Sequence, residues 1–189
     1  MNKILIIAIS IILGLATLVN AQKKGEIIYE TPEVPVDETT QKIIYTKVVD
    51  ATGSKDILFR KAITWFNKYY KNPTNVIREK DEVAGKIVAK ARIKVLNPPD
   101  KKGVQTMKGI VVYTLTCEFK EGRFKYTLND INLKAASYYA CERWLDTESQ
   151  TYSQVYNFFL QQVNDEINKT LTALKKHVTA SDEKKPEDW

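Results

Sequence analysis

The stretch from Gly85 to Val95, written GKIVAKARIKV, alternates between apolar and cationic residues. Its apolar members occupy every second position: Ile87, Ala89, Ala91, Ile93 and Val95. The positions between them hold mainly cations: Lys86, Lys90, Arg92 and Lys94. Successive side chains of a β-strand point to opposite faces of its sheet, so this pattern predicts a strand that is buried on one face and solvated on the other. A fold that contains such a strand covers only one side of the sheet.

Four further segments are predicted as strands, at residues 43–49, 76–80, 110–120 and 123–128. In residues 110–120 the apolar face carries Val111, Tyr113, Leu115, Cys117 and Phe119, and the next strand continues it with Phe124, Tyr126 and Leu128. From residue 76 onward short turns separate the strands, except for the polar, proline-containing loop 97–108. Consecutive strands without helical spacing between them are typical of an antiparallel meander.

Two helices complete the predicted domain. Ser54 can cap the first helix, whose apolar stripe is Leu58, Ala62, Trp65, Phe66 and Tyr69, and Asn72-Pro73 ends it. The second helix is predicted over residues 150–178, with Thr147 and Gln150 as a capping box. The order β-α-β-β-β-β-α predicts an α+β domain in which both helices cover one face of a curved antiparallel sheet. We expect the other face to be open to water.

The N-terminus has the pattern of a secretory signal peptide. Lys3 precedes the apolar run Ile4–Leu18, and Ala21 supplies a small residue at a cleavage site, so residues 1–21 are predicted to be removed on export. The alternative is an uncleaved N-terminal anchor, because the run approaches the length of a membrane span. No other stretch is apolar enough to span. We therefore expect a periplasmic or secreted protein of a Gram-negative-type bacterium.

The predicted domain covers residues 41–179. Residues 22–40 hold Pro32, Pro35 and five acids without a sustained period, which predicts a flexible arm or linker. Residues 180–189 form a charged segment that is predicted to be disordered. Cys117 and Cys141 would enter an oxidising compartment, where they could either form a disulfide or remain buried thiols.

The sequence offers little for catalysis. The single histidine, His177, lies near the predicted end of the last helix, where a cation is mildly favoured without any further role. No zinc-ligand spacing or nucleotide-binding motif is present, so no metal, cofactor or catalytic residue is predicted. Paired acids could still serve a hydrolase, and the candidates are Glu118, Asp130, Glu142 and Asp146.

The cationic face is the first candidate binding surface. It consists of Lys86, Lys90, Arg92, Lys94, Lys120, Arg123 and Lys125, with Glu118 among them. Such a row can be simply a solvated face that discourages sheets from stacking. It can also bind an anionic envelope component or a protein partner, in keeping with the formal net charge of +6. Nucleic acid is an improbable partner, because the aromatic residues are expected to point away from this face.

The second candidate is an apolar pocket between the last helix and the sheet. Its predicted lining is Tyr113, Phe119, Tyr126, Tyr152, Tyr156 and Phe159. Such a pocket would carry a small apolar ligand. The alternative is that these side chains simply pack in the core.

The segment order and two local strings resemble a known family. The strings are Gly53–Leu58 (GSKDIL), followed by Trp65 and Phe66, and Gly109–Ile131 (GIVVYTLTCEFKEGRFKYTLNDI). Together they resemble an exported bacterial family of unknown function whose fold is like that of the TATA-binding protein, over roughly residues 43–175. The resemblance implies this fold and export, and it supplies no catalytic residues. We therefore expect a non-enzymatic binding protein first, an apolar-ligand carrier second and a paired-acid hydrolase third.

Overall fold

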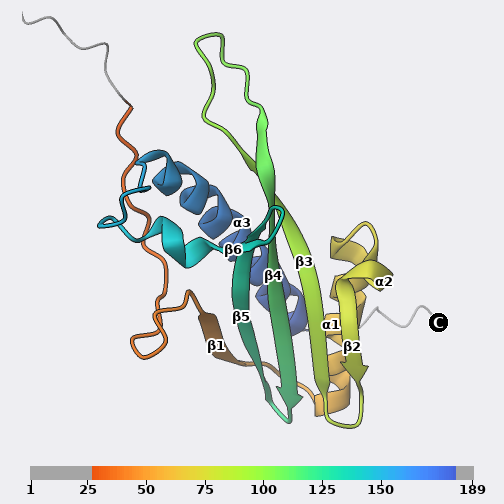
Figure 1. Cartoon of the computed structure of the whole chain (residues 1–189). Coiled ribbons are helices and arrows are strands. Elements are labelled where there is room, and N and C mark those ends of the chain that lie inside the picture. The colour runs from red at the N-terminus through yellow and green to blue at the C-terminus, as the bar shows by residue number, and fades with distance from the viewer. Residues whose placement is uncertain (1–26, 182–189) are drawn as a thin grey trace, which may run out of the picture.

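A computed structural model describes residues 27–181 of the 189-residue chain (Figure 1). The predicted signal peptide lies outside the described residues, as do the first part of the predicted arm and all of the predicted tail beyond Ser181.

The elements follow one another in nearly the predicted order. They are β1 (Tyr45–Asp50), α1 (Lys55–Tyr69), α2 (Pro73–Val76), β2 (Ile77–Asp81), β3 (Lys86–Leu96), β4 (Met107–Lys120), β5 (Arg123–Lys134), β6 (Tyr138–Ala140), the 3-10 helix η1 (Cys141–Trp144) and α3 (Val155–Thr179). The sheet has the order β1-β5-β4-β3-β2, and β6 pairs with β5 beyond the end of β1. All pairs are antiparallel. Helices α1 and α3 lie together behind the sheet in Figure 1, which confirms the predicted α+β class.

The predicted inner face of the sheet is the core. The alternate residues of β3 from Ile87 to Val95 are at most 6% exposed, and Ala89 lies opposite Leu115 of β4, which lies opposite Leu128 of β5. The predicted helix stripe is also buried apart from the half-buried Tyr69. Ser54 caps α1 as predicted, because its hydroxyl accepts a hydrogen bond from the Ile57 N–H at 3.3 Å.

The start of α3 differs from the prediction. The helix begins at Val155, and its N-cap residue Gln154 makes no capping side-chain bond, so the capping box at Thr147 and Gln150 is wrong. The preceding residues form turns in which the Ser149 hydroxyl accepts a hydrogen bond from the Thr151 N–H at 3.4 Å. Such local side-chain bonds offer the backbone an alternative to the helix.

The outer face of the sheet is covered in part, which corrects the prediction of a fully open face. Val112 points to this face, opposite Arg92 and Asn132, yet it is only 4% exposed. The ring of Tyr138 on β6 lies 5.3 Å from the Lys90 Nζ of β3, so it must reach across β5 and β4. In Figure 1 the segment between β5 and β6 passes in front of β4. Neither β6 nor the segment that covers this part of the outer face was predicted from the sequence.

The N-terminal arm has no helix or ladder strand from Ile27 to Thr40, but it is bound to α3. The buried Asn157 donates hydrogen bonds to the Tyr29 carbonyl at 2.9 Å and to the Thr31 hydroxyl at 3.1 Å. The ring of Tyr29 also packs 4.9 Å from that of Phe158. The described part of the arm is therefore attached along the last helix.

We expect Asn157→Ala to release this arm. The substitution removes both donors to the arm, and the free energy of unfolding should fall by about 1–3 kcal/mol. Limited proteolysis should then cut the chain near Tyr29 sooner than in the parent protein. Gln161→Ala is the matched control: this exposed residue of the same helix donates to Asp165 within the helix, and its loss should leave the cleavage rate unchanged. An unchanged rate in Asn157→Ala would show that these bonds do not hold the arm.

Candidate functional site

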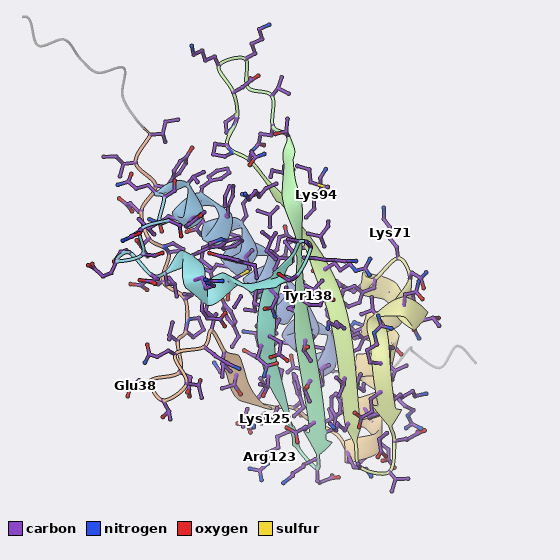
Figure 2. All side chains as sticks on the ribbon, in the orientation of Figure 1. Glu38, Lys71, Lys94, Arg123, Lys125 and Tyr138 are labelled. Carbon is purple, nitrogen blue, oxygen red and sulfur yellow. The ribbon has the colours of Figure 1, made fainter. Side chains whose placement is uncertain are left out.

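The predicted cations form two groups on the outer face rather than one patch. The lower cation group lies toward the β4–β5 turn and consists of Lys86, Lys120, Arg123 and Lys125. The upper cation group consists of Lys90, Arg92, Lys94 and Lys134. A row without cations separates the groups, in which Val88, Thr116 and Thr127 lie opposite one another. Figure 2 shows Arg123 and Lys125 at the lower end of the sheet and Lys94 near its upper end.

The lower cation group is partly neutralised. Lys86 Nζ lies 3.1 Å from the Glu79 carboxylate, and Lys125 Nζ lies 4.0 Å from that of Glu118. Arg123 lies opposite Asp50 of β1 in the ladder. These acids make the lower group the less suitable half for an anionic partner.

The upper cation group has no acidic partner among the described residues. Lys94 and Lys134 flank Ile110 in one cross-strand row, and Arg92 occupies the next row beside Val112. The Lys90 ammonium lies over the Tyr138 ring at 5.3 Å. Sequence reasoning missed Lys134 because its position on the outer face depends on the register shift in the β4–β5 pair between Val112 and Thr114.

The six residues of the predicted apolar pocket do not line one cavity. Phe119 packs between Phe59 of α1 and Phe124, whereas Tyr152, Tyr156 and Phe159 gather near the N-terminal end of α3. The remaining two, Tyr113 and Tyr126, each border a different surface hollow. These six aromatic residues therefore serve mainly in packing, and the structure does not gather them around one cavity.

A hollow that sequence reasoning missed lies between β3, the end of α1 and α3. We call it the β3-edge hollow; it has a volume of about 630 Å³. Its lining includes three tyrosines (Tyr69, Tyr70 and Tyr113), three residues of β3 with outward or edge positions (Arg92, Lys94 and Leu96), and Gln162, Asp165, Glu166 and Thr170 of α3. The lining residues come from four separate segments, including β4 through Tyr113, so no single motif could have revealed it.

The tyrosine hydroxyls of the β3-edge hollow are joined in pairs. The Tyr70 and Tyr113 hydroxyls lie 3.1 Å apart, and the Tyr69 hydroxyl lies 3.0 Å from that of Thr170. Burial raises the pKa of Tyr70 and of Tyr113 well above the usual value for tyrosine. Both phenols are therefore neutral at physiological pH and act as hydrogen-bonding groups.

The cysteines are free thiols, and the structure does not form the disulfide that the sequence left open. Cys117 lies opposite Tyr126, whereas Cys141 directly follows Ala140, which lies opposite Asn132. Six residues of a strand span about 20 Å, which is far beyond the reach of a disulfide. Burial also raises the pKa of both thiols, so neither is suited to be a nucleophile.

The four acids predicted as candidates for a catalytic pair either bond to other residues of the fold or are exposed on separate segments. The Glu142 carboxylate accepts a hydrogen bond from the Ile43 N–H at 3.0 Å, and Glu118 pairs with Lys125. Asp130 and Asp146 are exposed, on β5 and after η1 respectively. Within residues 27–181 no group of three or more histidine, cysteine or acidic side chains could hold a metal ion. No helix of this described part is long and apolar enough to cross a membrane.

The sheet order and the two helices on one face define an α+β domain with a fold like that of the TATA-binding protein. Residues 45–134 match the model of the family described as a domain of unknown function (DUF4468) with TBP-like fold. Among curated proteins, none is significantly similar to it in sequence.

Two solved structures support the fold. A DUF4468 family protein from Bacteroides ovatus aligns with a TM-score of 0.56 and 16% identity, covering 79% of this chain and 94% of that one. A TBP-like protein from Parabacteroides distasonis aligns with a TM-score of 0.54 and 15% identity, covering 76% of this chain and 98% of that one. At such low identity these likenesses show the fold alone.

Proposed function

We propose that this protein is an exported, non-enzymatic binding domain that uses the upper cation group to bind an anionic envelope component or protein partner. The proposal rests on the arrangement of three cations, Arg92, Lys94 and Lys134, around the apolar residues Ile110 and Val112. Among the described residues no acid is paired with these cations. Unpaired cations on a rigid sheet attract anionic groups without first breaking an ion pair.

Export is part of this proposal. It is supported by the Lys3 and Ile4–Leu18 pattern at the N-terminus, which is typical of a signal peptide. A periplasmic or secreted protein would meet anionic lipids, acidic glycans and other exported proteins. Fractionation of the native bacterium, with mass spectrometry of the N-terminus, tests this part: a protein found in the cytoplasm with Met1 retained would contradict it.

The binding experiment compares two variants of equal net charge. The purified protein is titrated with phosphatidylglycerol vesicles, heparin and poly-glutamate at low and physiological salt. Arg92→Gln/Lys94→Gln should weaken the tightest of these interactions about tenfold, since two charge contacts are lost. The control, Lys120→Gln/Arg123→Gln, removes the same charge from the lower cation group and should have little effect. Equal weakening by both variants would indicate bulk charge attraction and would contradict a site on the upper group.

A further inference from the structure

One half of β3 has no neighbouring strand on its outer edge. Strand β3 runs from Lys86 to Leu96, but β2 pairs only with Lys86–Ala89. In Figure 1, β3 continues well past β2, and no strand lies along its upper half on the side away from β4. Unpaired edges of this kind are templates for pairing with another chain.

The hydrogen-bonding groups of this edge can be assigned. The Phe119 N–H donates to the Gly85 carbonyl at 2.8 Å, so Gly85 and every second residue after it turn their backbone groups toward β4. The alternate residues of β3, from Lys86 onward, turn their backbone N–H and C=O groups away from β4. Arg92 and Lys94 therefore present their N–H and C=O groups to the unpaired edge, and no side-chain partner meets them in the part of the chain that the structure describes.

The far end of the edge shows how a neighbouring strand would bind. The Leu96 N–H donates to the Gln162 Oε1 at 3.0 Å, and the Leu96 carbonyl accepts from the Gln162 Nε2 at 3.0 Å. One side-chain amide thus satisfies both backbone groups, as a residue of an adjacent strand does. The edge is closed by β2 at one end and by Gln162 at the other, which leaves a gap centred on Arg92 and Lys94.

The space beside this gap is open. The β3-edge hollow, of about 630 Å³, follows Arg92, Lys94 and Leu96. A second hollow, of about 500 Å³, borders Lys90 and Arg92 on the side of α2. A short extended segment could therefore lie against the edge without displacing an element of the fold.

We propose that the free edge of β3 binds a short extended segment of a protein partner as an added strand. Side chains of an added strand alternate between the two faces of the sheet. Those on the outer face would lie beside the Arg92 and Lys94 side chains, so acidic residues fit there. Those on the inner face would meet the β3-edge hollow, where Asp165, Glu166 and the tyrosine hydroxyls favour small hydrogen-bonding residues. The partner is thus a segment in which acidic and small polar residues alternate.

This inference goes beyond the proposed function, because the partner strand is held by backbone groups of the edge, whereas the cationic side chains only favour acidic residues in it. The probe is a capped seven-residue peptide in which glutamate alternates with serine. This peptide is compared with two N-methylated isomers. In the first isomer the methyl groups are on the glutamate amides, and in the second they are on the serine amides. An added strand uses only one of these two sets of N–H groups, so one isomer should lose binding and the other should keep it. Loss with methylated glutamate would indicate an antiparallel strand, and loss with methylated serine a parallel one.

Amide hydrogen exchange of the protein locates the peptide. Saturating peptide should slow exchange at Arg92 and Lys94 about tenfold or more, while Ile93, whose N–H already faces β4, should not change. Lys94→Pro removes one edge N–H and leaves the β3–β4 ladder intact, so it should abolish peptide binding. Lys94→Gln keeps the N–H and loses only the charge, so it should weaken peptide binding but keep the slowed exchange at positions 92 and 94 in saturating peptide. Intact protection of the β4 amides confirms that the proline variant is folded.

Several outcomes would overturn the inference. Equal binding of both N-methylated isomers would show that the peptide is held by charge alone. Unchanged exchange at Arg92 and Lys94 in millimolar peptide would show that the edge takes no strand. Protection of these amides at high protein concentration without peptide, with a dimer in sedimentation, would assign the edge to a second copy of this chain instead.

Discussion

Raising the pH above about 10 is expected to unfold the protein cooperatively. Burial raises the pKa of six groups in the folded state: the phenols of Tyr45, Tyr70, Tyr113 and Tyr126 and the thiols of Cys117 and Cys141. In the unfolded chain tyrosine titrates near pH 10 and cysteine near pH 8.5. Above these values the unfolded state binds fewer protons than the folded state, so the free energy of unfolding falls as pH rises.

The expected slope is steep. Each group that is ionised only in the unfolded state costs about 1.4 kcal/mol per pH unit, so six groups together approach about 8 kcal/mol per unit. Urea denaturation at intervals between pH 8 and pH 11 measures this slope directly. Tyr70→Phe/Tyr113→Phe removes two titrating groups that bond to each other, and it should reduce the slope above pH 10 by about a third. Tyr138→Phe is the control, because that side chain is 59% exposed. A parent protein whose stability stays constant up to pH 11 would contradict this account.

Trp144→Ala is expected to be the most destabilising single substitution among those considered. Trp144 is 2% exposed, and its ring packs 5.8 Å from that of Phe159 and 6.3 Å from that of Tyr156. Removing a buried tryptophan side chain leaves a large cavity, and the free energy of unfolding should fall by about 3–5 kcal/mol. Chemical denaturation measures the loss.

The position of Trp144 gives this substitution a second readout. The residue ends η1, which directly follows β6, so the cavity should also loosen the segment that covers Val112. Hydrogen exchange of the Tyr138 and Tyr139 amides should therefore accelerate more than that of β3. Trp144→Phe keeps an aromatic ring in place and should show a smaller loss of stability. A cost below about 1 kcal/mol for the alanine variant would show that the ring contributes little packing.

The buried and the solvated face of the sheet were predictable from the alternation of apolar and polar residues along each strand. Strict alternation in β3 and β4 identifies the buried side chains, because shifting a strand by one residue would expose all of them. The helix stripe from Leu58 to Phe66 was predictable for the same reason at helical spacing. The start of α3 was not, since residues 147–154 have capping residues that bond within turns instead.

The candidate sites depended on facts that no local pattern contains. The cationic character of β3 was visible, but the division into two groups depends on Glu79 reaching Lys86 from β2 and on the register that brings Lys134 beside Ile110. The free edge depends on how far β2 extends and on the position of Gln162, which lies 66 residues from Leu96 along the chain. Periodicity predicts which face a residue occupies, and it does not predict where a neighbouring strand ends.

The pairing of β1 with β5 also affects how the chain assembles. During synthesis β1 leaves the ribosome before every other strand, but its partner residues Arg123–Leu128 follow only after β2, β3 and β4. The β3–β4–β5 meander forms contacts that are close in sequence, so it should form early, and β1 should join it late. The first strand to be synthesised is thus among the last to be paired. The nascent chain therefore stays incompletely folded until β5 has been synthesised.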